Sequence, residues 1–304
     1  MPSIAVIGAG LAGLSAAKIL DEAGWRVVVF EKSRGFGGRC ATKRLDGAVV
    51  DHGAQYFTMR DAAFRDAVHQ ACGDDVRRIL APVVSENGDE LPDTGRFYHV
   101  AGNSRLARAL GAGLDVRTGV RVEEIRDRMV HGETFDHILT TAPWPQTLTL
   151  AGREAENPYV PCLTAVLVFD GDPAGRAEST YAVSDRSGAP LLWSACENHK
   201  SGRIEPGRTV MVAQASSAFS REYLERDPAE WSAILQRLVE ERWNLSAPRE
   251  VLAHRWRFAR IGHRVESPEL PAGWTFAGDA LSTSRVESAW LEGRMAAVQL
   301  LEAA

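Results

Sequence analysis

Three glycines near the N-terminus constrain what this chain can fold into more than any other feature: Gly8, Gly10 and Gly13. They follow an apolar run over residues 4–7, which is typical of a buried parallel strand. Apolar residues then recur three positions apart over residues 14–23, and Gly24 follows where a helix C-cap is expected. The stretch "RVVVF" predicts a second strand, which ends at Glu31. The first thirty residues therefore predict a strand–helix–strand unit.

This order of elements gives each glycine a task. Gly8 permits a tight turn, Gly10 lets a pyrophosphate approach the backbone, and Gly13 lets the helix pack close to the strand. The helix N-terminus presents free N–H groups to the phosphates. Glu31 lies 18 residues after Gly13, close to where an acid accepts hydrogen bonds from a ribose. The pattern predicts a dinucleotide site, but it does not separate NAD from FAD.

A second glycine cluster, "EKSRGFGGR", continues directly from the acid, and "GAVVDHG" follows over residues 47–53. These segments resemble the extended fingerprint of the FAD-binding amine oxidase superfamily. There the second glycine pair and its arginine, here Gly37, Gly38 and Arg39, lie along the FAD pyrophosphate. The second half of FAD needs a further segment without side chains and a cation close to it. An NAD dehydrogenase does not need this second glycine cluster.

The C-terminal stretch "WTFAGDALSTSRVESAWLEGRMAAVQLL" resembles the same superfamily. The resemblance implies that Asp279 bonds a ribityl hydroxyl of FAD. It also implies that a helix beginning near Glu287 directs its N-terminus at the N1–C2=O edge of the flavin, where negative charge develops on reduction. The match puts the backbone N–H of Leu291 at that edge, and Trp290 on the substrate side of the ring. A packed core tryptophan is the alternative for Trp290.

The resemblance therefore implies FAD as the cofactor, held by both ends of the chain. The segment leading to the adenine-contacting strand places a backbone contact at Val122. The full set of expected cofactor contacts is Gly8, Gly10, Leu11, Ala12, Gly13, Glu31, Lys32, Gly37, Gly38, Arg39, Gly53, Ala54, Gln55, Val122, Thr141, Gly278, Asp279, Val286 and Leu291.

Three stretches resemble the renalase group within this superfamily: "DHGAQYFTMRDAAF", "AHRWRFAR" and "GDALSTSRVESAWLEGRMAA". The resemblance implies oxidation of β-NAD(P)H isomers whose hydride sits at ring position 2 or 6. The hydride passes to flavin N5, and dioxygen reoxidises the flavin to give hydrogen peroxide and NAD(P)+. Because losing hydride restores aromaticity, the protein has only to stack the ring on the flavin and exclude water.

The candidate pocket residues are Gln55, Tyr56, His254, Trp256 and Trp290. Tyr56 and Trp290 would wall the substrate ring. Gln55 and His254 would offer hydrogen bonds to a carboxamide or to the flavin edge, although a hydrogen-bonded core histidine is an equal alternative for His254. None of them is assigned as an essential acid or base.

Two other functions stay open. Aromatic residues facing a flavin also suit an amine oxidase or another small-molecule flavin dehydrogenase. A non-catalytic flavin-binding redox sensor is the third alternative.

Composition excludes several other classes. A net charge of −5 and a pI near 5.9 argue against nucleic-acid binding. Four widely spaced cysteines indicate neither a disulfide scaffold nor a metal site. No basic leader and no run of about 18 apolar residues occurs, so we expect a cytoplasmic protein away from membranes. Its expected partners are a dihydronicotinamide dinucleotide and O2.

The expected fold class is α/β. A Rossmann-like FAD-binding domain is predicted over residues 1–58, 94–146 and 254–304. An α+β substrate domain with a mixed or antiparallel sheet is predicted over residues 59–93 and 147–253, since "CLTAVLVFDG" and "RTVMVAQAS" read as strands.

Local signals predict further elements. Asp227 and Pro228 mark a helix start, as N-cap and first helical residue. A short helix capped near Asn103 or Ser104 precedes an expected strand pair over residues 115–125. The strand "FDHILTT" is expected to end in a proline-containing turn over residues 143–145.

Overall fold

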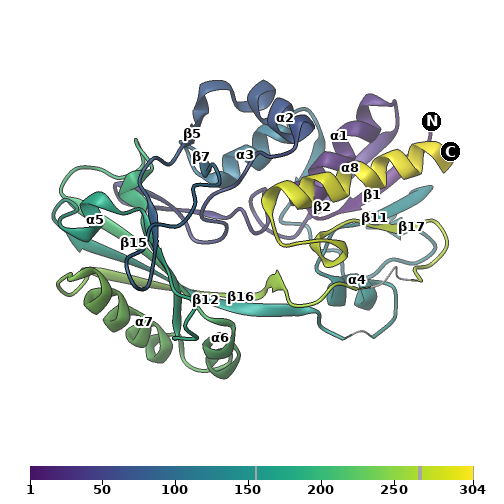
Figure 1. Cartoon of the computed structure of the whole chain (residues 1–304). Helices are drawn as coiled ribbons and strands as arrows, with labels where there is room; N and C mark the ends of the chain where they lie inside the picture. The colour runs from purple at the N-terminus through teal and green to yellow at the C-terminus, as the bar shows by residue number, and fades with distance from the viewer. Residues whose placement is uncertain (155, 266–268, 304) are drawn as a thin grey trace.

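The computed structural model describes residues 1–154, 156–265 and 269–303. Two sheets form separate halves of the molecule, and the two ends of the chain lie side by side in one half (Figure 1). This arrangement confirms the α/β class, and it places the first and last segments of the chain in the same half.

The first sheet has five parallel strands in the order β17-β11-β1-β2-β8. Their bounds are β1 Ser3–Ile7, β2 Arg26–Glu31, β8 Asp115–Thr118, β11 His137–Thr140 and β17 Trp274–Phe276. The central strand β1 is buried along its whole length. Burial on both faces explains why its sequence is a nearly continuous apolar run rather than an alternating one.

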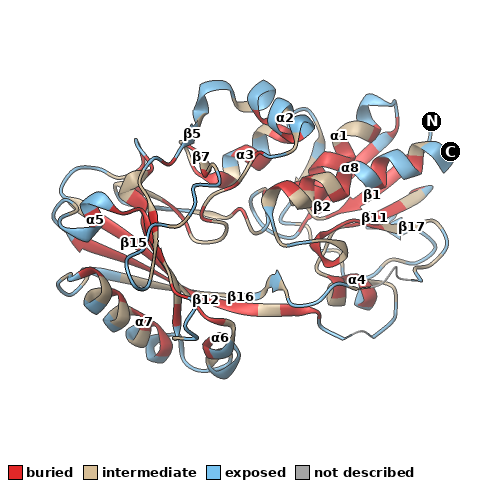
Figure 2. Cartoon of the chain, in the orientation of Figure 1, coloured by how far each residue is buried: buried red, intermediate tan, exposed pale blue. Residues whose placement is uncertain are grey.

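Helices pack on one face of this sheet and on each other. They are α1 Leu11–Glu22, α2 Ala62–Cys72, α3 Asn103–Leu110 and α8 Val286–Ala303. Figure 2 shows α1 and α8 with their buried sides turned inward and their exposed sides toward solvent. A Cβ added to Gly293 of α8 would lie 2.0 Å from the backbone oxygen of Ala12 in α1. Glycine at this position therefore lets the two helices, one from each end of the chain, pack in backbone contact.

The second sheet has six strands in the order β16-β12-β15-β14-β13-β6. Their bounds are β6 Val83–Ser85, β12 Tyr159–Asp170, β13 Ala182–Ser184, β14 Leu191–Cys196, β15 Arg208–Ala215 and β16 Glu250–Ile261. All neighbours are antiparallel except β13 and β6, so the sheet is mixed, as expected. Helices α5 Arg176–Ser179, α6 Ser217–Tyr223 and α7 Pro228–Trp243 accompany it. The Asp227 carboxylate accepts from the Ala229 N–H at 2.8 Å, which confirms the expected cap of α7.

Shorter elements complete the fold. They are the hairpins β3 Thr42–Leu45 with β4 Ala48–Asp51, β5 Val76–Arg78 with β7 Phe97–His99, and β9 Met129–Val130 with β10 Glu133–Thr134, the helix α4 Trp144–Leu150, and the 3-10 turns η1 Gly73–Asp75, η2 Glu197–His199 and η3 Asp279–Leu281. Within the described residues, no helix has the length and apolarity needed to cross a bilayer.

Four local expectations are corrected. Residues 119–125 form no strand beyond β8, and the expected proline turn over 143–145 is the start of helix α4, where proline is tolerated in the first turn. Helix α2 packs in the core of the first half, so a substrate domain cannot begin at residue 59. Strand β16 pairs with β12 across residue 254, so the boundary expected there falls inside the second sheet.

Candidate active site

A cavity of about 1890 Å³ lies between the two halves. It opens at the carboxyl ends of the parallel strands, where Ile7, Glu31 and Thr141 line it, and it is closed by strand β16 of the second sheet. This edge of an open parallel sheet is where such folds bind ligands. Single-ligand pockets measure roughly 300–1,000 Å³, so the cavity has room for a cofactor and a second molecule.

The first glycine turn forms one wall. Gly8 adopts a φ of +111°, and a Cβ on Gly13 would lie 2.0 Å from the Gly8 oxygen, which agrees with the expected turn and packing roles. Gly10 borders the cavity, and a Cβ there would meet no atom within 4 Å. The space beside Gly10 is therefore a gap in front of the α1 N-terminus, where Leu11 and Ala12 also line the cavity.

The acid at the end of β2 is fixed by backbone donors. Glu31 accepts from the Ala9 N–H at 2.8 Å through Oε2 and from the Ser33 N–H at 2.7 Å through Oε1. Each carboxylate oxygen has a second lone pair for a ribose hydroxyl. Lys32 and Val122 line the cavity beside it. Burial and the neighbouring charge of Arg121 lower the pKa of Lys32 from its ordinary value.

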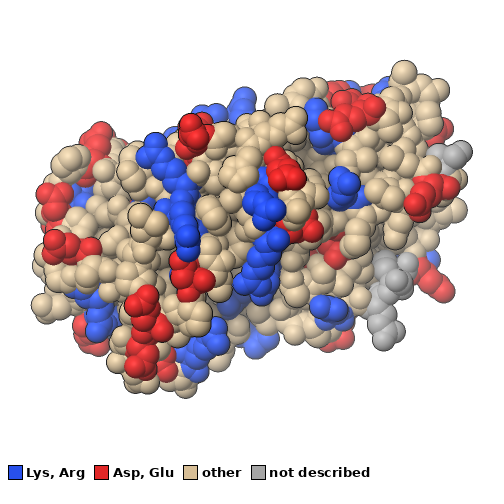
Figure 3. All heavy atoms as spheres, turned by 45° about the horizontal axis from the view of Figure 1, so that its top comes forward, with Lys and Arg blue, Asp and Glu red and all other residues tan. Residues whose placement is uncertain are grey.

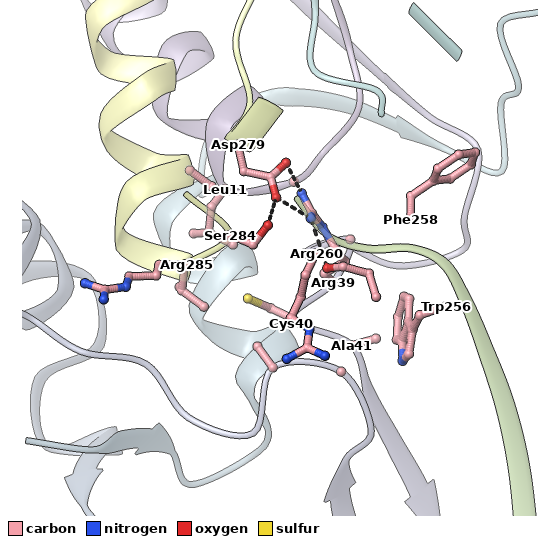
Figure 4. A pocket seen from close by; sticks show the side chains of 18 of the residues that line it. Leu11, Arg39, Cys40, Ala41, Trp256, Phe258, Arg260, Asp279, Ser284 and Arg285 are labelled. Atoms are coloured by element: carbon pink, nitrogen blue, oxygen red, sulfur yellow. Dashed lines mark hydrogen bonds and ion pairs between the residues drawn. The ribbon is translucent and has the colours of Figure 1, made fainter. Parts of the chain in front are cut away.

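The second glycine pair faces the first. Gly37 and Gly38 both have positive φ, and a Cβ on Gly38 would lie 3.7 Å from the Gly10 Cα on the cavity wall. Arg39 follows and forms two hydrogen bonds to Asp279, at 2.5 and 2.7 Å (Figure 4). Burial favours the neutral form of Asp279, but these bonds and the charge of Arg39 outweigh it and lower the pKa of the carboxyl.

Residues 52–55 form the wall opposite. The Gln55 amide donates to the Asp51 carbonyl, while its Oε1 is buried without a partner among the described residues. The Ala54 N–H donates to the Arg39 carbonyl at 2.9 Å, and a Cβ on Gly53 would lie 2.0 Å from that oxygen. This segment is therefore pressed against the second glycine cluster.

An aromatic cluster borders the same wall. His254 and Trp256 of β16 line the cavity with His52, and the ring centroids of His52 and His254 are 4.7 Å apart. Trp256 stacks on His52 and donates to its carbonyl at 2.9 Å. Burial and the proximity of His254 lower the pKa of His52 to about 4, and burial also lowers the pKa of His254. Both shifts favour the neutral imidazole.

Two expectations on α8 are corrected. Trp290 does not line the cavity: its ring packs on Phe64 in the core at 5.5 Å between centroids. Leu291 lies in the second turn of α8, where its N–H is used by the helix itself. The free N-terminus of α8 is one turn earlier, and Val286, also among the expected contacts, lines the cavity there.

A buried charge cluster behind the site was not foreseen. Asp51, Glu197, Lys200 and Arg203 are each buried, and Asp51 contacts Lys200 at 3.1 Å and Arg203 at 2.5 Å. Burial raises the pKa of Glu197. At Asp51 the charges of Lys200 and Arg203 outweigh burial and lower the pKa. The cluster joins the end of β4, a strand whose Ala48 and Val50 pack on the second sheet, to the η2 segment. Arg203 also donates to the His99 carbonyl at 2.7 Å, just ahead of α3 in the first half, so the cluster fixes the start of segment 52–55 between the two halves.

Charge distinguishes the cavity from the rest of the chain. Eleven arginines and one lysine line it, against three glutamates and one aspartate, although the whole chain carries −5. Figure 3 shows Lys and Arg side chains running down the middle of one face. Only a few of these cations were foreseen, because they come from segments scattered along the chain.

These features fit FAD. Gly10 and Gly38 leave a gap in front of the N-terminus of α1, and the N-terminus of α8 lines the same cavity. The unpartnered Gln55 oxygen can accept from a ring N–H. Such a fold and site define an FAD-dependent oxidoreductase.

Comparison with known proteins agrees. Residues 87–301 match the model of the flavin containing amine oxidoreductase family, and residues 6–71 match that of the NAD(P)-binding Rossmann-like domain. The chain belongs to the flavin containing amine oxidoreductase family, and its cofactor is FAD.

Individual relatives are more distant. The chain is 43% identical over 70 residues to a 4,4'-diapophytoene desaturase of Staphylococcus aureus, covering 23% of this chain and 14% of the relative. It is 28% identical over 201 residues to polyamine oxidase 4 of Oryza sativa subsp. japonica, covering 64% of this chain and 34% of the relative. The chain thus spans about a third or less of these relatives. A reduced UDP-galactopyranose mutase superposes with a TM-score of 0.80 over 100% of this chain and 96% of the other, but at 12% identity it shows the fold alone.

Proposed function

We propose that this protein oxidises isomeric dihydronicotinamide dinucleotides, 2- or 6-dihydro-NAD(P), to NAD(P)+. The substrate would give up the hydride from its ring, and O2 would be the final acceptor of the two electrons, taking one proton equivalent from the hydride and one from solvent to form hydrogen peroxide. FAD supplies the two-electron acceptor. Isomer repair would be the outcome of this reaction.

The cation excess of the cavity is the observation that carries the proposal. A dinucleotide substrate brings a pyrophosphate, and FAD brings a second one, so two polyanions share one cavity. A polyamine is a polycation and would be repelled by the same arginines. This contrast favours the dinucleotide over the amine substrates suggested by the family name.

The aromatic cluster supports a planar substrate. Trp256 is fixed by its bond to the His52 carbonyl. Burial favours the neutral form of His52 and His254, which then offer ring faces and hydrogen bonds without adding charge. A dihydropyridine regains aromaticity when it loses hydride and needs no added base. The residues required are those that orient the ring and exclude water.

Gln55 is proposed to position the reacting ring. Its amide nitrogen is held by the Asp51 carbonyl, which leaves Oε1 as an acceptor for the carboxamide N–H of the substrate or for an N–H of the cofactor ring. Gln55→Leu removes that acceptor at similar volume and is expected to lower the rate of cofactor reduction.

The test is oxygen consumption by the FAD-loaded protein with 2- and 6-dihydro-NAD(P), against a panel of amines that includes putrescine and spermine. We expect turnover on a dihydronicotinamide, with one peroxide and one NAD(P)+ formed per substrate. Turnover restricted to amines would establish the amine oxidase alternative instead. Stable flavin binding without turnover on any of them would favour a redox sensor.

A further inference from the structure

The far end of the cavity is not used by the segments that fit FAD. It is lined by β6, β13 and β14 of the second sheet and by the loop that precedes β7. FAD accounts for the wall formed by the glycine turns, Glu31 and the α8 N-terminus, and the cavity volume leaves space beyond it. What this end can bind is set by four side chains: Tyr56, Arg96, Arg186 and Trp193.

Two aromatic rings form its wall. Tyr56 directly follows Gln55, and its ring centroid lies 5.9 Å from that of Trp193 at an angle of 45°. Trp193 stands on β14 opposite Ser184 of β13, and both line the cavity. The Trp193 Nε1 is buried and has no acceptor among the described residues. The rings offer a flat apolar surface for a planar ligand, next to a donor that lacks a partner.

A buried cation lies against these rings. Arg96 is 6% exposed, and its guanidinium lies 5.7 Å from the Tyr56 ring centroid. The Pro92 carbonyl at 3.1 Å and the Asp93 carboxylate at 3.5 Å hold it in place, and its Nε has no partner in the described structure. Asp93 is also bound by Arg78 at 2.5 Å, so it neutralises Arg96 only in part.

A second cation stands at the mouth. Arg186 is exposed and forms no ion pair among the described residues. Its loop is anchored on both sides, because Asp185 bonds Arg242 at 2.5 Å and accepts from the Ser187 N–H at 3.0 Å. Among the described residues, the exposed Glu86 is the one carboxylate that lines this end. When Arg78 and Asp93, which lie behind Arg96, are included, three cations stand against two carboxylates, an excess of one positive charge.

We propose that Tyr56 and Trp193, with Arg96 and Arg186, form a subsite for the non-reacting half of a dinucleotide substrate, the rings contacting its base and the arginines its phosphates. The identity of the substrate rests on the proposed function. The subsite itself requires only a ligand in which a planar base is joined to phosphate. Arginine suits this role because its fork pairs with phosphate oxygens and its plane stacks on rings.

The test combines binding and kinetics on FAD-loaded protein. ADP-ribose, which carries the base and both phosphates but no nicotinamide, is titrated by calorimetry into the wild type, Arg186→Ala, Arg96→Met and Trp193→Leu. Arg237→Ala, an exposed change on α7 away from the cavity, is the matched control. We expect ADP-ribose to bind the wild type and the control alike, and each cavity variant about tenfold more weakly.

Kinetic constants separate a loss of substrate binding from a loss of folding or of catalysis. Arg186→Ala should raise KM for the dihydronicotinamide dinucleotide about tenfold with kcat unchanged, and leave KM for the corresponding mononucleotide, which lacks the second half, as in the wild type. Arg186 is exposed, so this variant is expected to fold even if Arg96→Met does not. Equal ADP-ribose affinity in the wild type and Arg186→Ala, or no binding by the wild type, would overturn the subsite. Binding of ADP-ribose without turnover of any dihydronicotinamide would keep the subsite and reject the proposed reaction.

Discussion

Arg39 and Asp279 lie 240 positions apart in the sequence, yet their side chains are joined by two hydrogen bonds of 2.5 and 2.7 Å. Asp279 also accepts from the hydroxyls of Tyr159, at 3.2 Å, and Ser284. The pair connects the second glycine cluster to the segment that leads into α8. One cavity wall is thus assembled only when both ends of the chain are in place, and the cofactor site depends on the whole fold.

Replacing Arg39 with methionine should weaken FAD binding by at least about tenfold, because it removes the cation beside the glycine gap and leaves Asp279 with neutral donors only. Titration of the apoprotein with FAD, followed by quenching of flavin fluorescence, measures the affinity. Arg237→Met on α7 serves as the control. An FAD affinity equal to that of the wild type would show that Arg39 has no part in cofactor binding.

Alanine substitutions of Gly10 and Gly13 should have different effects, the first on FAD binding and the second on stability. Gly10 has extended backbone at φ −77° and open space around a Cβ, so Gly10→Ala should fold normally and bind FAD more weakly. Gly13→Ala would force a Cβ to 2.0 Å from the Gly8 oxygen and should destabilise the apoprotein by roughly 1–3 kcal/mol. Thermal unfolding of both apoproteins, with FAD titration of the folded ones, checks the pair. Equal unfolding temperatures for Gly10→Ala and Gly13→Ala would show that the two glycines do not have these separate roles.

Much of this wall could be predicted from the sequence because its signals are local. The turn glycines, Glu31 and the acid of "TFAGD" sit at fixed offsets from strand ends, so their placement follows from short-range pattern. The start of α8 is also predicted to within one residue, near Glu287 against Val286 in the structure. The exception is the pair of contacts that the match on "WLEG" places at Leu291 and Trp290, one turn too far along the helix.

The second half offered fewer signals. Asp51 meets Arg203 and Lys200 across about 150 residues, and no periodicity links the segments. The same holds for the ring contact of Tyr56 with Trp193. Such contacts form when the second sheet packs against the first half of the molecule. They join residues far apart in the chain, so no local pattern in a single sequence predicts them.

Breaking the buried charge cluster should be costly. Lys200→Met leaves Asp51 and Glu197 to share Arg203 in a site that excludes water, and we expect a loss of about 3–5 kcal/mol in the free energy of unfolding. The exposed pair of Arg257 with Glu225 is the comparison, and Arg257→Met should cost less than about 1 kcal/mol. Denaturation in urea measures both. Equal costs for the two variants would show that the cluster does not hold the halves together.

His52 should make stability depend on pH. Its pKa is about 4 in the folded protein against 6.5 ordinarily, so the unfolded chain binds a proton first as pH falls. The free energy of unfolding should therefore decrease from about pH 6.5 toward pH 4, and the proton linkage vanishes above 6.5. In His52→Gln this contribution should be absent. Urea denaturation from pH 4.5 to 8 compares the two proteins; parallel curves would mean that His52 is not buried as a neutral ring.

The proposed reaction requires that FAD bound in this cavity accept a hydride from an isomeric dihydronicotinamide. The decisive measurement is flavin absorbance after anaerobic mixing of the FAD-loaded protein with 2- or 6-dihydro-NAD(P). We expect the oxidised flavin band to bleach with one NAD(P)+ formed per flavin, and to return when O2 is admitted. If the band stays unchanged with both isomers while dithionite bleaches it, the proposed reaction is wrong.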